Sequence, residues 1–384
     1  MPYEADDILE ALDEQQREAA LSLHGPTVIL AGAGTGKTRT ITHRIAYGIL
    51  RGDYTEQKVM ALTYTNKAAG ELRGRLRQLG VQSVGAKTFH AAALAQVEYF
   101  WREFFGIEAP RVLESKARAI GAAAESIKIR LDPNTIRDLA AEIEWRKYSM
   151  LSLEDYLDRI TERPAISGLA PIRNYEIQEV YEKAKVKAKQ VDWEDVLLLC
   201  TGMLKAEPRA LNHVHQQYRF FTVDEYQDIS ALQQELLDTW LGDRTDLCVV
   251  GDPNQTIYSF TGASASFLEN FEARYPDATT INLTKNYRST PEIIALANRV
   301  RGNQNLEPLQ AIRPSGSVPE LRGFETKDEE CAWVTERISL ALRDGVKASQ
   351  IAVLYRINSQ SEFIENALSN AGIEYQVRGG QRYF

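Results

Sequence analysis

The sequence predicts an α/β protein in which a parallel sheet is interrupted by an all-helical insertion. Near the N-terminus, strand-like runs at Thr27–Leu30 and Val59–Thr63 alternate with helix-like segments, which is typical of βαβ units. From residue 90 to about residue 213 no strand pattern occurs, and prolines punctuate helix-like segments. Strand character returns at Arg219–Val223 and Leu247–Val250, so we expect the first sheet to resume after the insertion.

A second αβ series is expected to begin near Thr279–Leu283 and to include strands at Ile351–Tyr355 and Glu374–Arg378. The length of 384 residues is enough for two or three domains, each with its own core. The expected domains are residues 1–88 together with 215–280 for the first sheet, 89–214 for the helical insertion and 281–384 for the second sheet.

The composition is that of a soluble globular protein, with 44% hydrophobic and 26% charged residues. No apolar run approaches the roughly 18 residues of a membrane helix, and the acidic N-terminus differs from a signal peptide. Cys200, Cys248 and Cys331 are widely spaced, which favours reduced thiols in a cytoplasmic protein. A net charge of −8 argues weakly against a nucleic-acid partner, because an acidic protein can carry a local basic groove.

The segment Ile29–Thr38 is the most informative in the chain, because it reads as a strand, a glycine loop and a helix start. Its glycines allow consecutive backbone N–H groups to converge on phosphate oxygens. Lys37 is placed to reach the β- and γ-phosphates, and the Thr38 hydroxyl to bind Mg²⁺. The first position of the pattern is Ala31 instead of glycine, a mild departure. The segment therefore predicts a nucleoside triphosphate site.

A pair of carboxylates follows the expected strand at 219–223. Asp224 and Glu225 would lie at the carboxyl end of a parallel strand, beside the phosphate loop. There Asp224 could hold Mg²⁺ directly or through water, and Glu225 could orient and deprotonate the attacking water. An acidic turn after a buried strand is the alternative, which the phosphate loop disfavours.

The next strand is followed by Gly251–Gly262, which combines an amide with aromatic side chains. Gln255 could sense a γ-phosphate by hydrogen bonding without adding negative charge. Tyr258 and Phe260 offer flat faces for stacking on nucleobases, an interaction of roughly 1–3 kcal/mol per base. Taken alone, such aromatic residues are more often part of a core.

These motifs together resemble the UvrD/Rep/PcrA group of superfamily 1 DNA helicases, and the resemblance covers essentially the whole chain. The segments that carry it are Leu12–Ala19, the phosphate loop, Thr63–Ala69, Thr88–His90, Val223–Asp228, Gly251–Gly262 and Asn286–Thr290. The run from Gln255 to Gly262 looks most like the second, actinobacterial type of UvrD helicase. The resemblance implies a RecA-like first domain, a helical insertion and the N-terminal part of a second RecA-like domain.

The resemblance also implies ATP and Mg²⁺ as cofactors. Gln16 would recognise adenine, Tyr287 would stack on it, and Arg288 would point its guanidinium at the γ-phosphate. The implied catalytic residues are Lys37, Asp224, Glu225, Gln255 and Arg288, with Thr38 and Asp224 as metal ligands. The implied ATP-binding residues are Gln16, Gly32, Ala33, Gly34, Thr35, Gly36, Lys37, Thr38, Arg39, Tyr287 and Arg288.

The expected partners are single-stranded DNA and junctions of single- and double-stranded DNA, with repair or transcription proteins as further candidates. The DNA-binding residues implied by the resemblance are Tyr64, Thr65, His90, Tyr258, Phe260, Arg356 and Asn358. The segment Asp192–Asp195 resembles the point at which the family's insertion returns to the first domain, and it reads equally well as a helix cap. Lys183, Lys185, Lys187 and Lys189 are expected to form a solvated face, because alternate residues scatter around a helix.

Two departures from the family pattern affect the expected activity. Phe260-Thr261 stands where many relatives have Trp-Arg, which removes a charged link between DNA and nucleotide. The chain also stops where the family inserts its second accessory domain. We therefore expect a truncated, nucleoid-associated 3′→5′ helicase that binds ATP, hydrolyses it weakly and does not unwind DNA. The alternatives are the motor part of a helicase–nuclease, or a non-motor ATP-binding adaptor, which has no need of Glu225.

Overall fold

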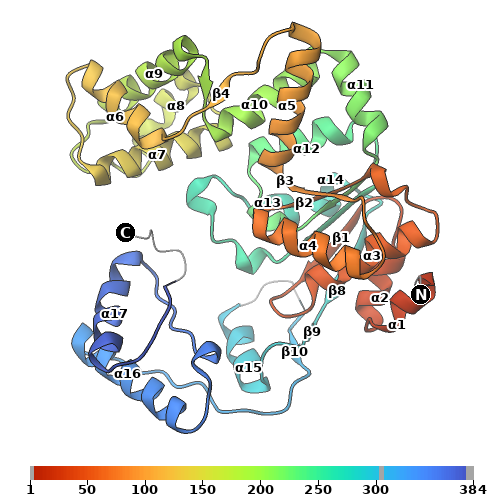
Figure 1. Ribbon diagram of the computed structural model, residues 1–384, viewed down its shortest axis with the longest axis vertical. Coiled ribbons are helices and arrows are strands. Elements are labelled where there is room, and N and C mark those ends of the chain that lie inside the picture. The colour runs from red at the N-terminus through yellow and green to blue at the C-terminus, as the bar shows by residue number, and fades with distance from the viewer. Residues whose placement is uncertain (1–3, 302–306, 378–384) are drawn as a thin grey trace. The chain divides into compact units, whose positions relative to one another are not determined.

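The computed structural model describes residues 4–301 and 307–377 (Figure 1). The chain forms two compact units, residues 1–316 and residues 317–384, which we describe separately. In the described part of the chain, no helix is long and apolar enough to cross a lipid bilayer.

The first unit is built on a parallel six-stranded sheet with strand order β3-β2-β6-β7-β1-β8. Its strands are β1 (Thr27–Ala31), β2 (Val59–Thr63), β3 (Gly85–Thr88), β6 (Phe220–Val223), β7 (Leu247–Gly251) and β8 (Thr279–Leu283). The sheet therefore resumes after a long insertion, as the sequence predicts. The prediction that Thr279–Leu283 opens a second sheet is wrong: β8 pairs with β1 along its whole length, and the boundary expected at 280/281 falls inside it. Its alternating apolar pattern gave no indication of which sheet it would join.

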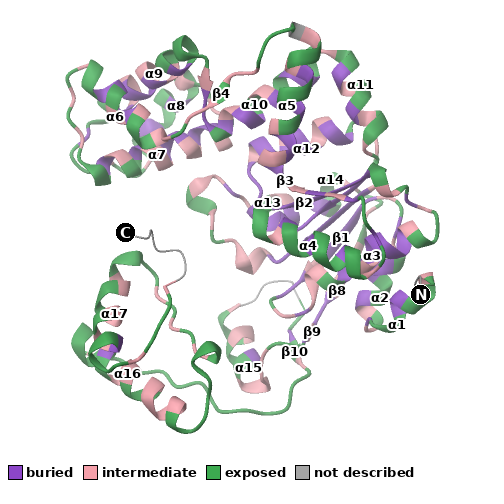
Figure 2. Ribbon diagram, viewed as in Figure 1, coloured by how far each residue is buried: buried purple, intermediate pink, exposed green. Residues whose placement is uncertain are grey.

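Helices cover both faces of this sheet, and each face has its own hydrophobic core (Figure 2). Neighbouring residues of one strand point to opposite faces, so Val249 of β7 belongs to one core and Val250 to the other. The first core includes residues of α5 (Phe89–Phe105), α10 (Trp193–Ala206), α11 (Pro208–Gln217), α12 (Ala231–Leu241), α13 (Ser266–Glu269) and α14 (Phe271–Arg274). The second includes residues of α1 (Ala5–Glu10), α2 (Glu14–Leu21), α3 (Lys37–Leu50) and α4 (Asn66–Gln78).

The expected insertion at 89–214 divides into two parts. The helices α5, α10 and α11 pack on the sheet, whereas α6 (Lys116–Ser126), α7 (Pro133–Tyr148), α8 (Leu153–Arg159) and α9 (Pro171–Ala188) lie beyond them (Figure 1). These outer helices enclose a third core that includes Ile120, Ile143 and Tyr181. A short parallel ladder of β4 (Arg111–Val112) and β5 (Gln190–Val191), which the sequence did not predict, closes the base of this subdomain.

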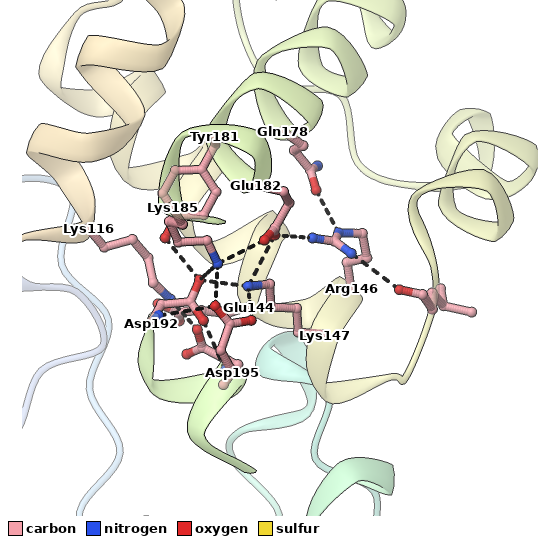
Figure 3. A network of polar contacts seen from close by, with 12 residues as sticks. Lys116, Glu144, Arg146, Lys147, Gln178, Tyr181, Glu182, Lys185, Asp192 and Asp195 are labelled. Carbon is pink, nitrogen blue, oxygen red and sulfur yellow. Dashed lines mark hydrogen bonds and ion pairs between the residues drawn. The ribbon is translucent and has the colours of Figure 1, made fainter. Parts of the chain in front are cut away.

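A cluster of buried ion pairs joins α7 and α9 to the start of α10 (Figure 3). Lys147 Nζ lies 2.7 Å from Asp192 Oδ2 and 2.6 Å from Asp195 Oδ1, and Lys185 also contacts both carboxylates. Asp192 is at the same time the N-cap of α10, so both readings of this segment apply. The solvated face expected for the lysines of α9 is wrong for Lys185. Positions four residues apart share one helix face, and Lys185 follows the core residue Tyr181 at that spacing.

The rest of the first unit contains β9 (Lys285–Asn286), α15 (Pro291–Val300) and β10 (Gln310–Ala311), and the second unit contains α16 (Lys327–Arg343) and α17 (Ser361–Asn370). The short 3₁₀ turns are η1 (Glu56–Lys58), η2 (Ile160–Glu162), η3 (Tyr226–Asp228), η4 (Pro253–Gln255), η5 (Ser259–Thr261), η6 (Ala348–Gln350) and η7 (Asn358–Gln360). The strands predicted at Ile351–Tyr355 and Glu374–Arg378 are wrong for the described residues, which pair with no neighbour there. A strand is stabilised by its partners, and an alternating pattern alone supplies none. Arg378 lies outside the described residues.

Candidate nucleotide and DNA sites

The phosphate loop connects β1 to α3, and its conformation depends on glycine. Gly34 and Gly36 have φ angles of 77° and 88°, in the left-handed region that favours glycine. Gln16 stabilises the loop, because its Nε2 donates to the Thr35 carbonyl at 2.9 Å. The Thr35 hydroxyl in turn donates to the Gly32 carbonyl at 2.8 Å. The backbone N–H groups at the start of α3 are thereby presented as a ready anion site.

A second segment, the Asn286–Ser289 run, lies directly against this loop. Asn286 Nδ2 donates to the Ala33 carbonyl at 2.5 Å, and the Tyr287 N–H donates to the Gly34 carbonyl at 2.9 Å. A Cβ added to Gly34 would come within 2.6 Å of Asn286 Nδ2, so only glycine fits there. Asn286 also accepts the N–H groups of the two residues after Tyr287. No role for Asn286 was predicted from the sequence, because the phosphate loop that it contacts lies 253 positions earlier in the chain.

Gln16 and Tyr287, the residues expected to meet adenine, lie at one end of the loop. Gln16 is buried and forms a capping box with Asp13 at the start of α2. Asp13 Oδ2 accepts a hydrogen bond from the Tyr287 hydroxyl at 2.5 Å. Tyr287 is 43% exposed, which leaves a ring face available for stacking.

The loop opens into a cavity of about 340 Å³. Its lining residues are Ala33, Gly34, Gly36, Lys37, Thr38, Arg39, Arg75, Glu225, Gln255, Tyr287 and Arg288. Four of the five residues expected to be catalytic therefore meet at one cavity, although they come from distant parts of the sequence. Arg75 of α4 also lines the cavity, and no sequence pattern predicted it.

Lys37 and Glu225 form an ion pair across this cavity, with Nζ 3.1 Å from Oε2. Glu225 has a φ of 52°, and a non-glycine residue in the left-handed region is strained. Such strain is retained where the surrounding structure requires a particular side-chain direction. Here it directs the Glu225 carboxylate into the cavity beside the ammonium group of Lys37.

Asp224 is buried and is not among the residues that line the cavity. Its Oδ1 accepts the Glu225 N–H at 3.0 Å. Burial, reinforced by the neighbouring Glu225, raises the pKa of Asp224 to about 7. A buried carboxylate of this kind gains from a nearby cation. With the Thr38 hydroxyl it provides oxygen donors, which is the ligand chemistry that Mg²⁺ prefers. The residues present therefore fit an Mg²⁺ ion.

Gln255 reaches the cavity from η4, just past the end of β7. Its Nε2 donates to Asp252 Oδ2 at 2.8 Å, which fixes the direction of the amide. Arg39 also lines the cavity, and its guanidinium donates to the Ala11 carbonyl at 2.5 Å. Arg288 completes the wall, with its backbone N–H bonded to Asn286.

Three aromatic side chains that are expected to contact DNA, those of Tyr64, Tyr258 and Phe260, lie close together. The rings of Tyr64 and Tyr258 stack with centroids 4.8 Å apart, and Phe260 lies 6.3 Å from Tyr258. Phe260 is 62% exposed, so the alternative of a core position is wrong for this residue. Thr65 is the N-cap of α4, and its hydroxyl accepts the Ala68 N–H at 3.1 Å.

Tyr64 and His90 also line a second cavity, of about 190 Å³. Burial, together with the charge of Lys116, lowers the pKa of His90 to about 4. His90 is therefore neutral near pH 7, and its Nε2 lies 3.2 Å from the Tyr148 hydroxyl. Tyr148 comes from the helical subdomain, so this cavity combines residues of the sheet edge and of α7. Arg356 and Asn358 belong to the second unit.

The protein family of this chain follows from its matches to known family models. The model described as the UvrD/REP helicase N-terminal domain matches residues 12–276, and that of the UvrD-like helicase C-terminal domain matches residues 281–384. The chain belongs to the UvrD-like helicase family. The matched regions include both sides of the 340 Å³ cavity, since Lys37 and Glu225 fall in the first and Arg288 in the second.

Individual members of the family are similar along the whole chain. The ATP-dependent DNA helicase UvrD2 of Mycobacterium tuberculosis is 42% identical over 100% of this chain and 57% of its own length. UvrD1 of the same organism is 32% identical, over 100% of this chain and 52% of its own length. The helicase PcrA of Staphylococcus epidermidis is 27% identical, over 98% and 52% respectively. The chain thus spans little more than half the length of the curated relatives it matches.

Proposed function

We propose that the protein is a DNA translocase that hydrolyses ATP·Mg²⁺ to move 3′→5′ along single-stranded DNA and unwind duplexes. The observation that carries this proposal is the convergence of Lys37, Glu225, Gln255 and Arg288 on one cavity. A phosphate loop alone indicates nucleotide binding. A carboxylate, an amide and an arginine around the same cavity are the parts that phosphoryl transfer to water requires.

The chemistry follows from the charges that line the cavity. Lys37 and Arg288 would face the triphosphate, where fixed cations stabilise the charge that develops on the transferred phosphoryl group. Lys37 would exchange its contact with Glu225 for phosphate oxygens, which frees the carboxylate to accept a proton from the attacking water. Mg²⁺, held by Thr38 and Asp224, would supply further positive charge at the phosphates.

The DNA track would run over Tyr64, Tyr258 and Phe260. Stacking on aromatic rings is tolerant of base sequence, which suits an enzyme that moves along any strand. His90, neutral near pH 7, would contribute a polar ring edge and no phosphate-binding charge. Junctions between single- and double-stranded DNA would be the substrates of unwinding, and repair or transcription proteins are candidate partners.

A polypeptide of residues 1–384 alone should bind ATP·Mg²⁺, hydrolyse it slowly and fail to unwind DNA. The aligned relatives are almost twice as long, so contacts that the remainder of such a protein makes are absent from this polypeptide. Nucleotide binding is measured with a fluorescent ATP analogue, and unwinding with a 3′-tailed duplex. Lys37→Met should abolish nucleotide binding by removing the ammonium group. Robust unwinding by residues 1–384 would contradict the inactivity expected of this polypeptide, and unchanged nucleotide binding by Lys37→Met would contradict the proposed ATP site.

A further inference from the structure

The side chain of Gln227 bridges the ends of two neighbouring strands. Its Nε2 donates to Glu225 Oε2 at 2.8 Å, and its Oε1 accepts the Asp252 N–H at 3.1 Å. Gln227 is only 1% exposed, and its hydrogen bond with the Asp252 N–H is buried, whereas the one to Glu225 lies at the edge of the open cavity. One amide therefore links the carboxylate at the end of β6 to the backbone that follows β7.

Only a glutamine side chain serves this bridge. It needs a donor at one end for Glu225 and an acceptor at the other for the Asp252 N–H. A glutamate would present a second negative charge to Glu225, and a methionine of similar length would remove the hydrogen bonds that Gln227 makes to Glu225 and to the Asp252 N–H. The neighbouring backbone is shaped around the same amide. A Cβ added to Gly251 would come within 2.5 Å of Gln227 Oε1.

The bridge continues toward the aromatic residues. Asp252 Oδ2 accepts from Gln255 Nε2 at 2.8 Å, and Gln255 lines the nucleotide cavity. Three residues later in the chain, Tyr258 stacks on Tyr64. A displacement of this segment would carry the Asp252 N–H with it, and Gln227 would follow because it has no other acceptor role among the described contacts.

Glu225 Oε2 also receives the ammonium group of Lys37, at 3.1 Å. Two donors therefore share one oxygen. When a triphosphate draws Lys37 away, Gln227 is left as the side-chain donor that orients this carboxylate. The direction of Glu225 toward water then depends on a residue whose own position is set by the segment that leads to Tyr258.

We propose that Gln227 is a positioning residue that couples single-stranded DNA at Tyr258 and Phe260 to the direction of the Glu225 carboxylate. It touches neither nucleotide nor DNA, and acts through Glu225 on one side and Asp252 on the other. DNA that shifts the 252–260 segment changes the hydrogen bond that Gln227 donates, and thereby the rate of ATP hydrolysis. This inference rests on the proposed function.

The test compares ATP hydrolysis by the complete protein with and without single-stranded DNA, for wild type and Gln227→Met. We expect the stimulation by DNA to fall by about tenfold or more, the effect of losing one hydrogen bond to a charged group. The KM for ATP and the affinity for DNA should change by less than about threefold, because Gln227 contacts neither. The loss should therefore lie in kcat measured with DNA.

Gln234→Met is the matched control. Gln234 is also a buried glutamine, but it accepts from the Tyr226 hydroxyl and donates to Asp238, away from Glu225. The Gln234→Met variant should be less stable than wild type, but single-stranded DNA should still stimulate its ATP hydrolysis. Gln227→Glu, which preserves size and the acceptor for Asp252, replaces Gln227→Met if the latter does not fold, and should lose the stimulation equally.

The outcomes separate this inference from the proposed function. A wild-type protein that shows no stimulation by DNA overturns the proposed function. A stimulated wild type with an equally stimulated, folded Gln227 variant overturns the positioning role alone. Loss of stimulation in Gln234→Met as large as in Gln227→Met would also overturn it, because the effect would then come from disturbing any buried amide.

Discussion

Replacing Lys185 by methionine should destabilise the helical subdomain far more than its position on a lysine-rich helix suggests. Lys185 Nζ lies 2.8 Å from Glu182 Oε2 and 2.8 Å from Asp192 Oδ2, contacts Asp195, and is 3% exposed (Figure 3). The cluster also contains Arg146 and Lys147, so three basic groups face three acidic groups. Removing Lys185 leaves three acidic groups facing two basic ones, so one buried negative charge is no longer balanced.

The size of the effect follows from burial. Removing one partner of a buried ion pair costs about 3–5 kcal/mol, because the remaining charge stays desolvated. Lys183→Met is the control on the same helix. Lys183 is 71% exposed and has one ion pair, with Glu179 at i,i−4. Such a pair contributes about 0.3–0.5 kcal/mol. The two substitutions should therefore differ by roughly tenfold in free energy.

Urea unfolding followed by circular dichroism measures both variants, and pH provides a second arm. Burial alone would raise the pKa of Asp192 and of Glu182, but Lys147 and Lys185 outweigh burial and lower both values. Lowered carboxyl pKa values add stability above the unfolded-state pKa, and this stability is lost as the pH falls through the folded-state pKa. The cost of Lys185→Met should therefore be greatest near neutral pH and shrink below about pH 4. Equal costs for Lys183→Met and Lys185→Met at pH 7 would refute the reasoning.

Three further predictions concern the two sites. Gly34→Ala should weaken nucleotide binding by about tenfold or more, whereas Gly52→Ala, also at positive φ but with open space around it, should leave binding unchanged in a fluorescence titration. Phe260→Ala should weaken single-stranded DNA binding by about 1–3 kcal/mol in an anisotropy assay, and the equally exposed Ile257→Ala should not, because an aliphatic side chain cannot stack. Because burial lowers the pKa of His90 to about 4, its ring stays neutral between about pH 6 and 8. The DNA affinity of His90→Asn should therefore have the same pH dependence as that of wild type in this range. A difference between the two proteins centred near pH 6.5 would contradict this.

The parts of the site that are contiguous in the sequence could be predicted from it. The run from Ala31 to Thr38 and the Asp224-Glu225 pair carry their chemistry in their spacing, and the structure brings Lys37 and Glu225 to 3.1 Å. Four strands of the large sheet and the helical insertion between the second and third of them could also be predicted, because βαβ units have a recognisable alternation, whereas β3 was not predicted. A local sequence pattern indicates whether a segment forms a helix, a strand or a loop, and which functional side chain that segment carries.

Contacts between distant segments were not accessible in this way. The pattern of Thr279–Leu283 indicates a strand, but its pairing with β1 depends on which edge is open in the folded chain. Lys185 looks like its neighbours on α9 until the opposing carboxylates of α10 are known. Gln227 lies inside a recognised motif, yet its partner N–H belongs to Asp252, just past the end of another strand.

ATP hydrolysis by this protein, measured with and without single-stranded DNA for wild type and Glu225→Gln, tests the central claim most directly. Glutamine preserves the shape of Glu225 and its place beside Lys37 but cannot accept a proton from water. We expect DNA to accelerate hydrolysis by wild type in the complete protein, and Glu225→Gln to bind ATP with undiminished affinity while hydrolysis is lost. Hydrolysis by Glu225→Gln at the wild-type rate, or wild-type hydrolysis that ignores DNA, would contradict the account.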